Sequence, residues 1–167
     1  AIAKWVVFAL IEAEEYGITQ ANVDGMVKDS KDPVVQRILG TSEDTGKLRV
    51  TYHHNFFSGT NQRHPRVRFG NPVHVYNNYY ASIGSYGVAS TCNAGVLVEG
   101  NYFENTDDPY HLAEGDSPNG SLVARNNYLT GSGTGQTGGS VASIPYSYTM
   151  ETASGVKSSV TAGAGAK

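Results

Sequence analysis

The sequence predicts an all-β solenoid, in which short strands stack coil upon coil, preceded by a short helical segment. The first observation is a phrase that occurs four times: a run of β-forming residues, then asparagine, then an aromatic residue or leucine. The second is its spacing, because the matching asparagines Asn55, Asn78, Asn101 and Asn127 lie 23, 23 and 26 residues apart. A strand-rich repeat of this period is typical of a solenoid. The third is that residues 1–40 have helical periodicity, whereas from Leu48 the pattern changes to short strands.

Composition sets broad limits on the class of protein. A chain of 167 residues is about one domain, and its 20 glycines and 11 tyrosines favour turns and strands. The net charge of −3, with no extended basic face, argues against nucleic-acid binding, and no apolar run is long enough to span a membrane. Cys92 is the single cysteine, so we expect a buried free thiol. The chain begins at Ala1 without methionine, so we expect a processed or partial product.

Residues 1–40 have the periodicity of packing helices. The first helix is indicated by apolar residues at helical spacing, namely Ile2, Trp5, Val6, Ala9, Leu10 and Ala13. Gly17 fits a C-terminal cap, and we expect Thr19 to cap a second helix that carries Val23 and Met26. Asp32 is expected to cap a third helix, which starts at Pro33 and ends at Gly40 with the apolar face Val34, Val35, Ile38 and Leu39. No residue here requires a catalytic role.

The same opening resembles the C-terminal region of periplasmic amino-acid-binding proteins, in AKWVVFALIEAEEYGITQANVD and DPVVQRILG. The likeness lacks the ligand-binding lobes, so no amino-acid pocket can be built from it. We therefore interpret the chain as an apparent chimera of four parts: a helical segment (1–40) that caps the coils or is a foreign fusion, a join (41–47), β-helix coils (48–130), and a C-terminal wrap and tail (131–167).

We expect the four asparagines to occupy the same corner of successive coils. Asparagine tolerates left-handed backbone, and its amide can bond to the amides above and below. Aromatic rows should stack beside this ladder, from Phe56, Phe57, Tyr79, Tyr80, Tyr102, Phe103 and Tyr128. The alternative is a meander or sandwich with asparagine-rich turns, although sandwich turns usually recur at shorter intervals. After residue 130 the composition is typical of a loop, but the spacing of Val156 and Val160 predicts a packed segment with a short terminal helix.

Three arginines and a proline stand within residues 63–68, beginning with Arg63. A strand from Arg66 would place Arg66 and Arg68 on one face and Val67 and Phe69 on the other. Guanidinium groups bind carboxylates in a planar, two-pronged manner, so such a face suits a polyuronate chain. The alternative is a solvated basic edge that pairs with local acids such as Glu104 or Asp107.

Two other groups could carry chemistry. His53 and His54 are adjacent on a predicted strand and should face opposite ways, so we expect structural roles, with one inside the coils and His74 near one of them. An acidic run offers oxygen ligands for calcium, namely Glu104, Asp107, Asp108, Glu114 and Asp116. Its spacing is not that of a regular calcium loop, so we expect a solvated loop.

The phrase RHPRVRFG, framed by VTYHHN before and VHVYNNYY after, resembles the pectate lyases of the parallel β-helix type, polysaccharide lyase family 1. The resemblance runs from about residue 44 to residue 166. It implies a right-handed parallel β-helix and a secreted, calcium-dependent enzyme that cleaves polygalacturonate by β-elimination. It assigns removal of the C5 proton to Arg63 and substrate binding to Arg68. We expect Arg66 to bind substrate as well, because alternation places it on the same strand face as Arg68.

The chain departs from this family upstream of VTYHHN. The family's calcium ligands lie there, and in this chain the helical opening replaces that region, so no metal ligands can be named. The alternative function is therefore a non-catalytic β-helix remnant that binds polysaccharide. In either case we expect a monomer whose partner is an acidic polysaccharide such as polygalacturonate or pectin.

Overall fold

The computed structural model describes residues 15–32, 35 and 48–165, and the chain divides into two units, residues 1–46 and 47–167. Each unit is described by itself. Among the described residues, no helix is long and apolar enough to cross a membrane. The predicted helix over residues 1–13, most of the predicted third helix and the predicted join at 41–47 lie outside the described residues.

The first unit contains helix α2 (Val23–Asp29). Gly17 has a left-handed φ of 65°, as a C-terminal cap requires. The prediction that Thr19 caps the helix is wrong, because the helix begins after Asn22. The Asn22 side-chain oxygen accepts the Thr19 N–H at 2.7 Å and closes a turn before the helix. Asp32 Oδ1 accepts the Val35 N–H at 3.3 Å, a spacing that an N-cap would give, but the start of the predicted third helix lies outside the described residues.

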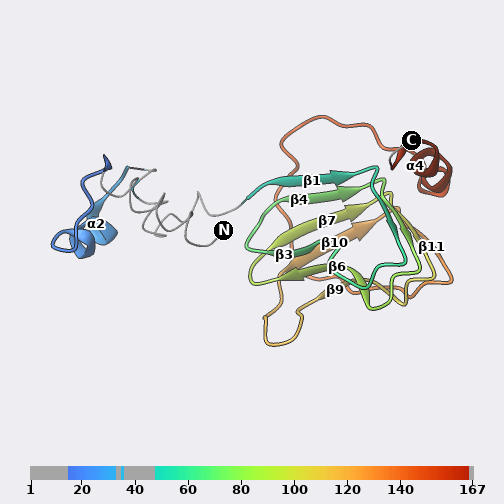
Figure 1. Cartoon of the computed structure of the whole chain (residues 1–167), viewed down its shortest axis with the longest axis horizontal. Coiled ribbons are helices and arrows are strands. Elements are labelled where there is room, and N and C mark those ends of the chain that lie inside the picture. Colours follow the sequence, from blue (N-terminus) through green and yellow to red (C-terminus); the bar gives the residue numbers. More distant parts are fainter. Residues whose placement is uncertain (1–14, 33–34, 36–47, 166–167) are drawn as a thin grey trace. The chain divides into compact units, whose positions relative to one another are not determined.

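The second unit is a parallel β-helix with three sheets, and every strand pair is parallel (Figure 1). The first sheet contains β1 (Val50–His53), β4 (Val73–Tyr76), β7 (Gly95–Glu99) and β10 (Ser121–Arg125). The second contains β2 (Phe56–Ser58), β5 (Tyr79–Ala81), β8 (Tyr102–Glu104) and β11 (Tyr128–Thr130). The third contains β3 (Arg66–Arg68), β6 (Tyr86–Thr91) and β9 (Asp108–Leu112). The solenoid prediction is confirmed, and a meander of antiparallel strands is excluded.

The 23-residue repeat sets the register between coils. Val50 pairs with Val73, and Val73 pairs with Val96. Because side chains alternate along a strand, alternate valines of each coil face inward and form a continuous core. Val75, Val88, Val96 and Val98 are each fully buried in this core.

The asparagine ladder is present. The Asn55 amide donates to Asn78 Oδ1 at 2.9 Å, the Asn78 amide to Asn101 Oδ1 at 3.0 Å, and the Asn101 amide to Asn127 Oδ1 at 3.0 Å. The prediction of left-handed backbone at these asparagines is wrong by one residue. The left-handed positions are those just before them, with φ between 48° and 62°: His54, Asn77, Gly100 and Asn126. The left-handed residue turns the corner, and the following asparagine then aligns its amide with the stack.

Two aromatic rows flank the ladder on opposite faces of the second sheet. Inside the coil, Tyr80 stacks between Phe57 and Phe103, with ring centroids 5.0 and 4.4 Å apart. The outer row runs from Phe56 through Tyr79 and Tyr102 to Tyr128. Near the C-terminus lie a 3₁₀ turn (Ala153–Gly155) and helix α4 (Val156–Gly163). Val156 and Val160 of α4 pack on the outer row. The predicted terminal helix is confirmed.

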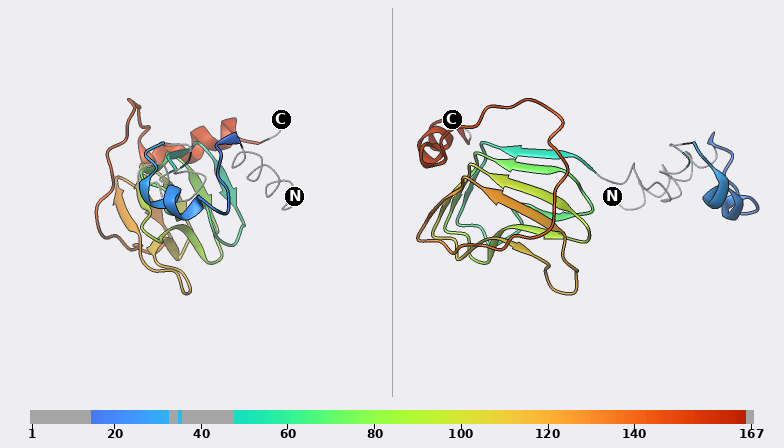
Figure 2. Two further views of the ribbon diagram at one scale, coloured as in Figure 1. Left: turned by 90° about the vertical axis from the view of Figure 1, so that its left-hand side faces the viewer. Right: turned by 180° about the vertical axis from the view of Figure 1, so that it is seen from behind.

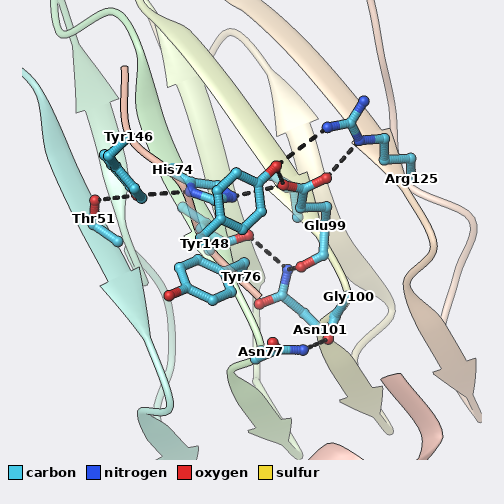
Figure 3. A network of polar contacts seen from close by, with 12 residues as sticks. Thr51, His74, Tyr76, Asn77, Glu99, Gly100, Asn101, Arg125, Tyr146 and Tyr148 are labelled. Atoms are coloured by element: carbon cyan, nitrogen blue, oxygen red, sulfur yellow. Dashed lines mark hydrogen bonds and ion pairs between the residues drawn. The ribbon is translucent and has the colours of Figure 1, made fainter. Parts of the chain in front are cut away.

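The C-terminal segment before α4 runs along the outer face of the first sheet (Figure 2). Tyr146 and Tyr148 hold it there by contacts with buried polar groups on the strands (Figure 3). The Tyr146 hydroxyl lies 2.8 Å from His74 Nδ1 and 2.6 Å from Thr51 Oγ1. We call residues 141–152 the strap. The predicted packed segment is therefore present.

Candidate functional site

The arginine phrase lies along the third sheet. Val67 is buried in the core, whereas Arg66 is half-buried and Arg68 is exposed, so the predicted alternation holds for these three residues. The prediction for Phe69 is wrong, because this side chain is 55% exposed. The strand ends at Arg68, and the left-handed φ of 66° at Phe69 turns the ring outward. The Arg68 guanidinium then lies 5.7 Å from the centroid of that ring.

Arg63 lies just before β3, and its side chain is exposed. Its φ is +72°, a left-handed conformation that costs an L-residue with a side chain about 1 kcal/mol or more. Residues held in such conformations concentrate at functional sites, where the surrounding structure fixes them. Here the surrounding structure is the next coil, since the His64 N–H donates to the Gly87 carbonyl at 2.8 Å.

Part of the Arg66 guanidinium is used in hydrogen bonds within the fold. Its Nη2 donates to the Glu114 carbonyl at 3.1 Å and to Ser117 Oγ at 2.8 Å. These bonds hold the turn at Glu114–Ser117 beside β3. Of the three arginines, Arg63 and Arg68 are the ones whose side chains are exposed.

Glu104, one of the acids proposed as partners of a solvated basic edge, pairs with another residue. Glu104 pairs with Lys157 at 2.8 Å and accepts a hydrogen bond from Tyr79, both on the outer side of the second sheet. None of the ion pairs within residues 48–165 includes Arg63 or Arg68. The arginine edge is therefore available to an anionic ligand.

On β9 and the turn that follows it, a histidine lies between two acids. His111 Nδ1 lies 2.5 Å from Asp108 Oδ2, and His111 Nε2 lies 3.3 Å from Glu114 Oε2. The Tyr86 ring packs on His111 with centroids 4.4 Å apart. Across the described part of the chain, no group of three or more His, Cys, Asp or Glu side chains could hold a metal ion.

The histidine pair differs from its prediction. His53 Nδ1 and His54 Nδ1 lie 2.9 Å apart, and the two rings meet edge-on at an interplanar angle of 88°. β1 ends at His53, and the left-handed φ of 55° at His54 brings the second ring back toward the first. His54 Nε2 also contacts Glu151 Oε1 of the strap at 2.9 Å. Neither ring lies inside the coils: His53 is exposed and His54 is half-buried. His74 lies under the strap, where its ring stacks on Tyr76, and Tyr76 in turn stacks on His53.

Cys92 is free and buried, as expected. It lies next to the arginine edge, and its carbonyl accepts the Phe69 N–H at 3.1 Å. Burial acts to raise the pKa of the thiol, but hydrogen bonds with Ser117 and Arg68 outweigh it and lower the pKa. The electrostatic environment of this edge thus favours negative charge.

Sequence reasoning missed Tyr86 and the turn at Glu114–Ser117 as parts of this site. The signal for Tyr86 was available, because it lies 23 residues after Arg63 and thus occupies the same place one coil later. No such signal pointed to the turn, because the contacts of Arg66 with Glu114 and Ser117 link residues about fifty positions apart.

All of the comparisons with known proteins indicate the same family. A family model described as "Pectate lyase" matches residues 21–167, so the match begins within the segment interpreted above as a cap or a foreign fusion. Pectate trisaccharide-lyase of Bacillus licheniformis is 35% identical over 130 residues, which cover 77% of this chain and 38% of the relative. Pectate lyase A of Emericella nidulans is 38% identical over 123 residues, which cover 74% of this chain and 36% of the relative. The chain thus spans well under half the length of these relatives.

Solved structures agree. Pectate lyase II of Xanthomonas campestris superposes with a TM-score of 0.62 at 33% identity, over 70% of this chain and 40% of that chain. A pectate lyase of Bacillus sp. N165, solved in complex with trigalacturonate, superposes with a TM-score of 0.60 at 32% identity, over 66% of this chain and 38% of that chain. The sequence, the parallel coils and these likenesses lead to one conclusion: the chain belongs to the pectate lyase family.

Proposed function

We propose that this chain carries the arginine part of a pectate lyase site, which cleaves polygalacturonate by β-elimination on the outer face of the third sheet. The observation that carries the proposal is the arginine edge itself. Arg63 and Arg68 are exposed and lie outside the ion pairs of the described chain; Arg68 is the last residue of β3, and Arg63 lies just before that strand. A rigid row of guanidinium groups suits a regularly spaced polycarboxylate.

In this proposal Arg63 removes the proton from C5 of a galacturonate unit. The electron pair of that C–H bond forms the C4=C5 double bond, the C4–O bond breaks, and the departing oxygen takes a proton from solvent. An arginine base needs its neutral form, although the unperturbed pKa of arginine is far above neutrality. An alkaline medium favours that form.

Arg68 binds the carboxylate of the substrate in the proposal. Its guanidinium is exposed beside Phe69, so it can offer two N–H groups to one carboxylate. Arg66 is proposed as a further binding residue of smaller effect, because its Nη2 is already bonded to Glu114 and Ser117.

The relatives support the remaining assignments. The Bacillus sp. N165 enzyme was solved with trigalacturonate, so we assign an acidic polysaccharide as the substrate class here. Homologous pectate lyases are generally secreted, and we propose the same location, with a monomer as the working unit.

Enzymes of this family generally depend on calcium. The described residues do not fit a calcium site, because no group of three suitable side chains converges among them. We therefore assign no calcium ligands within residues 15–32, 35 and 48–165, and no step of the mechanism above is assigned to the metal.

That observation favours a second candidate function. A β-helix that keeps its arginine edge without a metal site could bind polygalacturonate and not cleave it. The two functions share binding by Arg68 and differ in product formation.

Calorimetric titration with oligogalacturonate tests the shared part. Arg68→Ala should weaken binding at least tenfold, because it removes a two-pronged charged contact. The matched control is Arg49→Ala, which removes an exposed arginine that borders the first sheet instead. Equal affinity of wild type and Arg68→Ala would contradict the proposed binding face, and product formation then separates enzyme from binding protein.

A further inference from the structure

Tyr86 occupies, one coil later, the place of Arg63. The pairing of Arg66 with Ala89 continues toward the N-terminus, so residue 63 lies across from residue 86. Two backbone hydrogen bonds flank this position, each 2.8 Å long: from the Ser85 N–H to the Asn61 carbonyl and from the His64 N–H to the Gly87 carbonyl. Adjacent coils of a parallel sheet lie about 4.8 Å apart, so the two side chains are direct neighbours.

The Tyr86 hydroxyl is buried and unsatisfied. The residue is 1% exposed, and its hydroxyl makes no hydrogen bond of normal geometry within the described part of the chain. An unsatisfied buried hydroxyl costs about 1–3 kcal/mol, and phenylalanine would fill the same space without that cost. Such a group calls for an explanation other than packing.

Charged and titratable groups surround this hydroxyl. Arg63 and Arg66 face it from the preceding coil, His111 packs on its ring from β9, and Glu114 faces it from the following turn. Asp108 pairs with Tyr86 in register and contacts His111. Burial raises the pKa of Tyr86, and the charge of Glu114 acts in the same direction, while Arg63 and Arg66 oppose them without cancelling the rise. The phenol therefore stays neutral at alkaline pH, where an arginine base would operate.

We propose that Tyr86 is the positioning residue for Arg63. Its hydroxyl oxygen accepts one N–H of the Arg63 guanidine and fixes the plane of the group, so that another nitrogen faces the C5 proton of the substrate. A neutral acceptor suits this task. A carboxylate or phenolate in the same place would favour the protonated guanidinium and suppress the base. This inference rests on the proposed function.

The first test is Tyr86→Phe, which removes a single oxygen atom. Because the proposed partner of the hydroxyl is the exposed Arg63 side chain, the melting temperature should change little. We expect kcat on polygalacturonate to fall about 10- to 100-fold, the scale expected for a misplaced catalytic group, with KM unchanged because Arg68 still binds. Tyr79→Phe, which removes a hydroxyl on the second sheet, is the matched control for activity. A kcat within twofold of wild type and an unaltered pH profile would overturn the proposal.

The second test does not depend on activity. Selective ¹³C labelling of tyrosine allows the Tyr86 hydroxyl to be titrated by NMR in wild type and in Arg63→Ala. Loss of the opposing guanidinium should move the titration of Tyr86 to higher pH. If wild type forms no product, the proposed function fails but this titration still decides the pairing. An unchanged Tyr86 titration in Arg63→Ala would overturn the inference even in an active enzyme.

Discussion

His74 and Glu99 form a buried hydrogen-bonded pair on the outer face of the first sheet, with His74 Nε2 2.7 Å from Glu99 Oε1 and both side chains almost completely inaccessible (Figure 3). Glu99 also accepts hydrogen bonds from Arg125 Nε and the Tyr148 hydroxyl, each at 2.5 Å. His74 in turn contacts Tyr146. This one carboxylate thus links three coils to the strap.

Replacement of Glu99 by glutamine should lower the free energy of unfolding by about 1–3 kcal/mol. The amide cannot accept bonds from His74, Arg125 and Tyr148 in the same arrangement, so buried donors lose their charged acceptor. Chemical denaturation monitored by circular dichroism measures the loss. Glu151→Gln is the control, since Glu151 also contacts a histidine, His54, but is exposed, and its replacement should cost under about 1 kcal/mol. Equal effects of the two variants would contradict the assigned importance of the buried pair.

The same pair predicts how stability depends on pH. Burial lowers the pKa of His74, although Glu99 partly opposes this, so the folded chain binds a proton at His74 less readily than the unfolded chain does. Stability should therefore fall as pH decreases from about 6.5 toward the lower pKa of the folded state. Burial acts to raise the pKa of Glu99, but the hydrogen bonds that it accepts from Arg125, Tyr148 and His74 outweigh burial and lower the pKa. The stability that the Glu99 carboxylate contributes is therefore lost only at more acidic pH.

Melting temperatures measured from pH 7 to pH 5 test this dependence. His74→Gln keeps a donor for Glu99 but cannot titrate, so its melting temperature should change less with pH than that of wild type across this range. A wild-type melting temperature that rises as pH falls would contradict the account.

The asparagine ladder should contribute strongly at its centre. Asn101→Ala removes an acceptor for the Asn78 N–H and a donor to the Val75 carbonyl, both buried. Each unsatisfied buried group costs about 1–3 kcal/mol, so a loss of several kcal/mol is expected. Asn127→Ala, at the half-buried end of the ladder, should cost less. Denaturation midpoints of the two variants give the comparison, and a smaller loss for Asn101→Ala would be inconsistent with this account.

The left-handed backbone at Arg63 should lower the stability of any variant that keeps a side chain there. Glycine adopts a φ of +72° without the penalty that a side chain brings, so Arg63→Gly should be more stable than Arg63→Ala by about 1 kcal/mol. Both variants should lack lyase activity. Thermal unfolding measures the difference, and a glycine variant less stable than the alanine variant would show that the backbone there is unstrained.

The coils were predictable because their physical cause is local and repeated. Four asparagines at regular spacing indicated stacked coils, and alternation along the strand placed Arg66 and Arg68 opposite Val67. The errors at Phe69 and His54 have one cause. Both residues lie just past the end of a very short strand, where a left-handed φ replaces alternation.

Contacts between distant segments could not be predicted. Tyr146 and Tyr148 reach His74 and Glu99 across about fifty to seventy residues, and nothing in their local sequence specifies those partners. The residues proposed for catalysis are a different case. Arg63 and Arg68 were assigned by family resemblance, and the structure adds their exposure and their neighbour Tyr86.

The most direct test of the central claim is ultraviolet absorbance of unsaturated uronate released from polygalacturonate at alkaline pH with added calcium. We predict steady product formation by the wild-type chain, and none by Arg63→Ala at equal circular dichroism and equal binding of oligogalacturonate. Product formation that persists in Arg63→Ala would contradict the assigned base. A folded wild-type chain that binds oligogalacturonate but releases no product would contradict the lyase and leave the binding β-helix as its function.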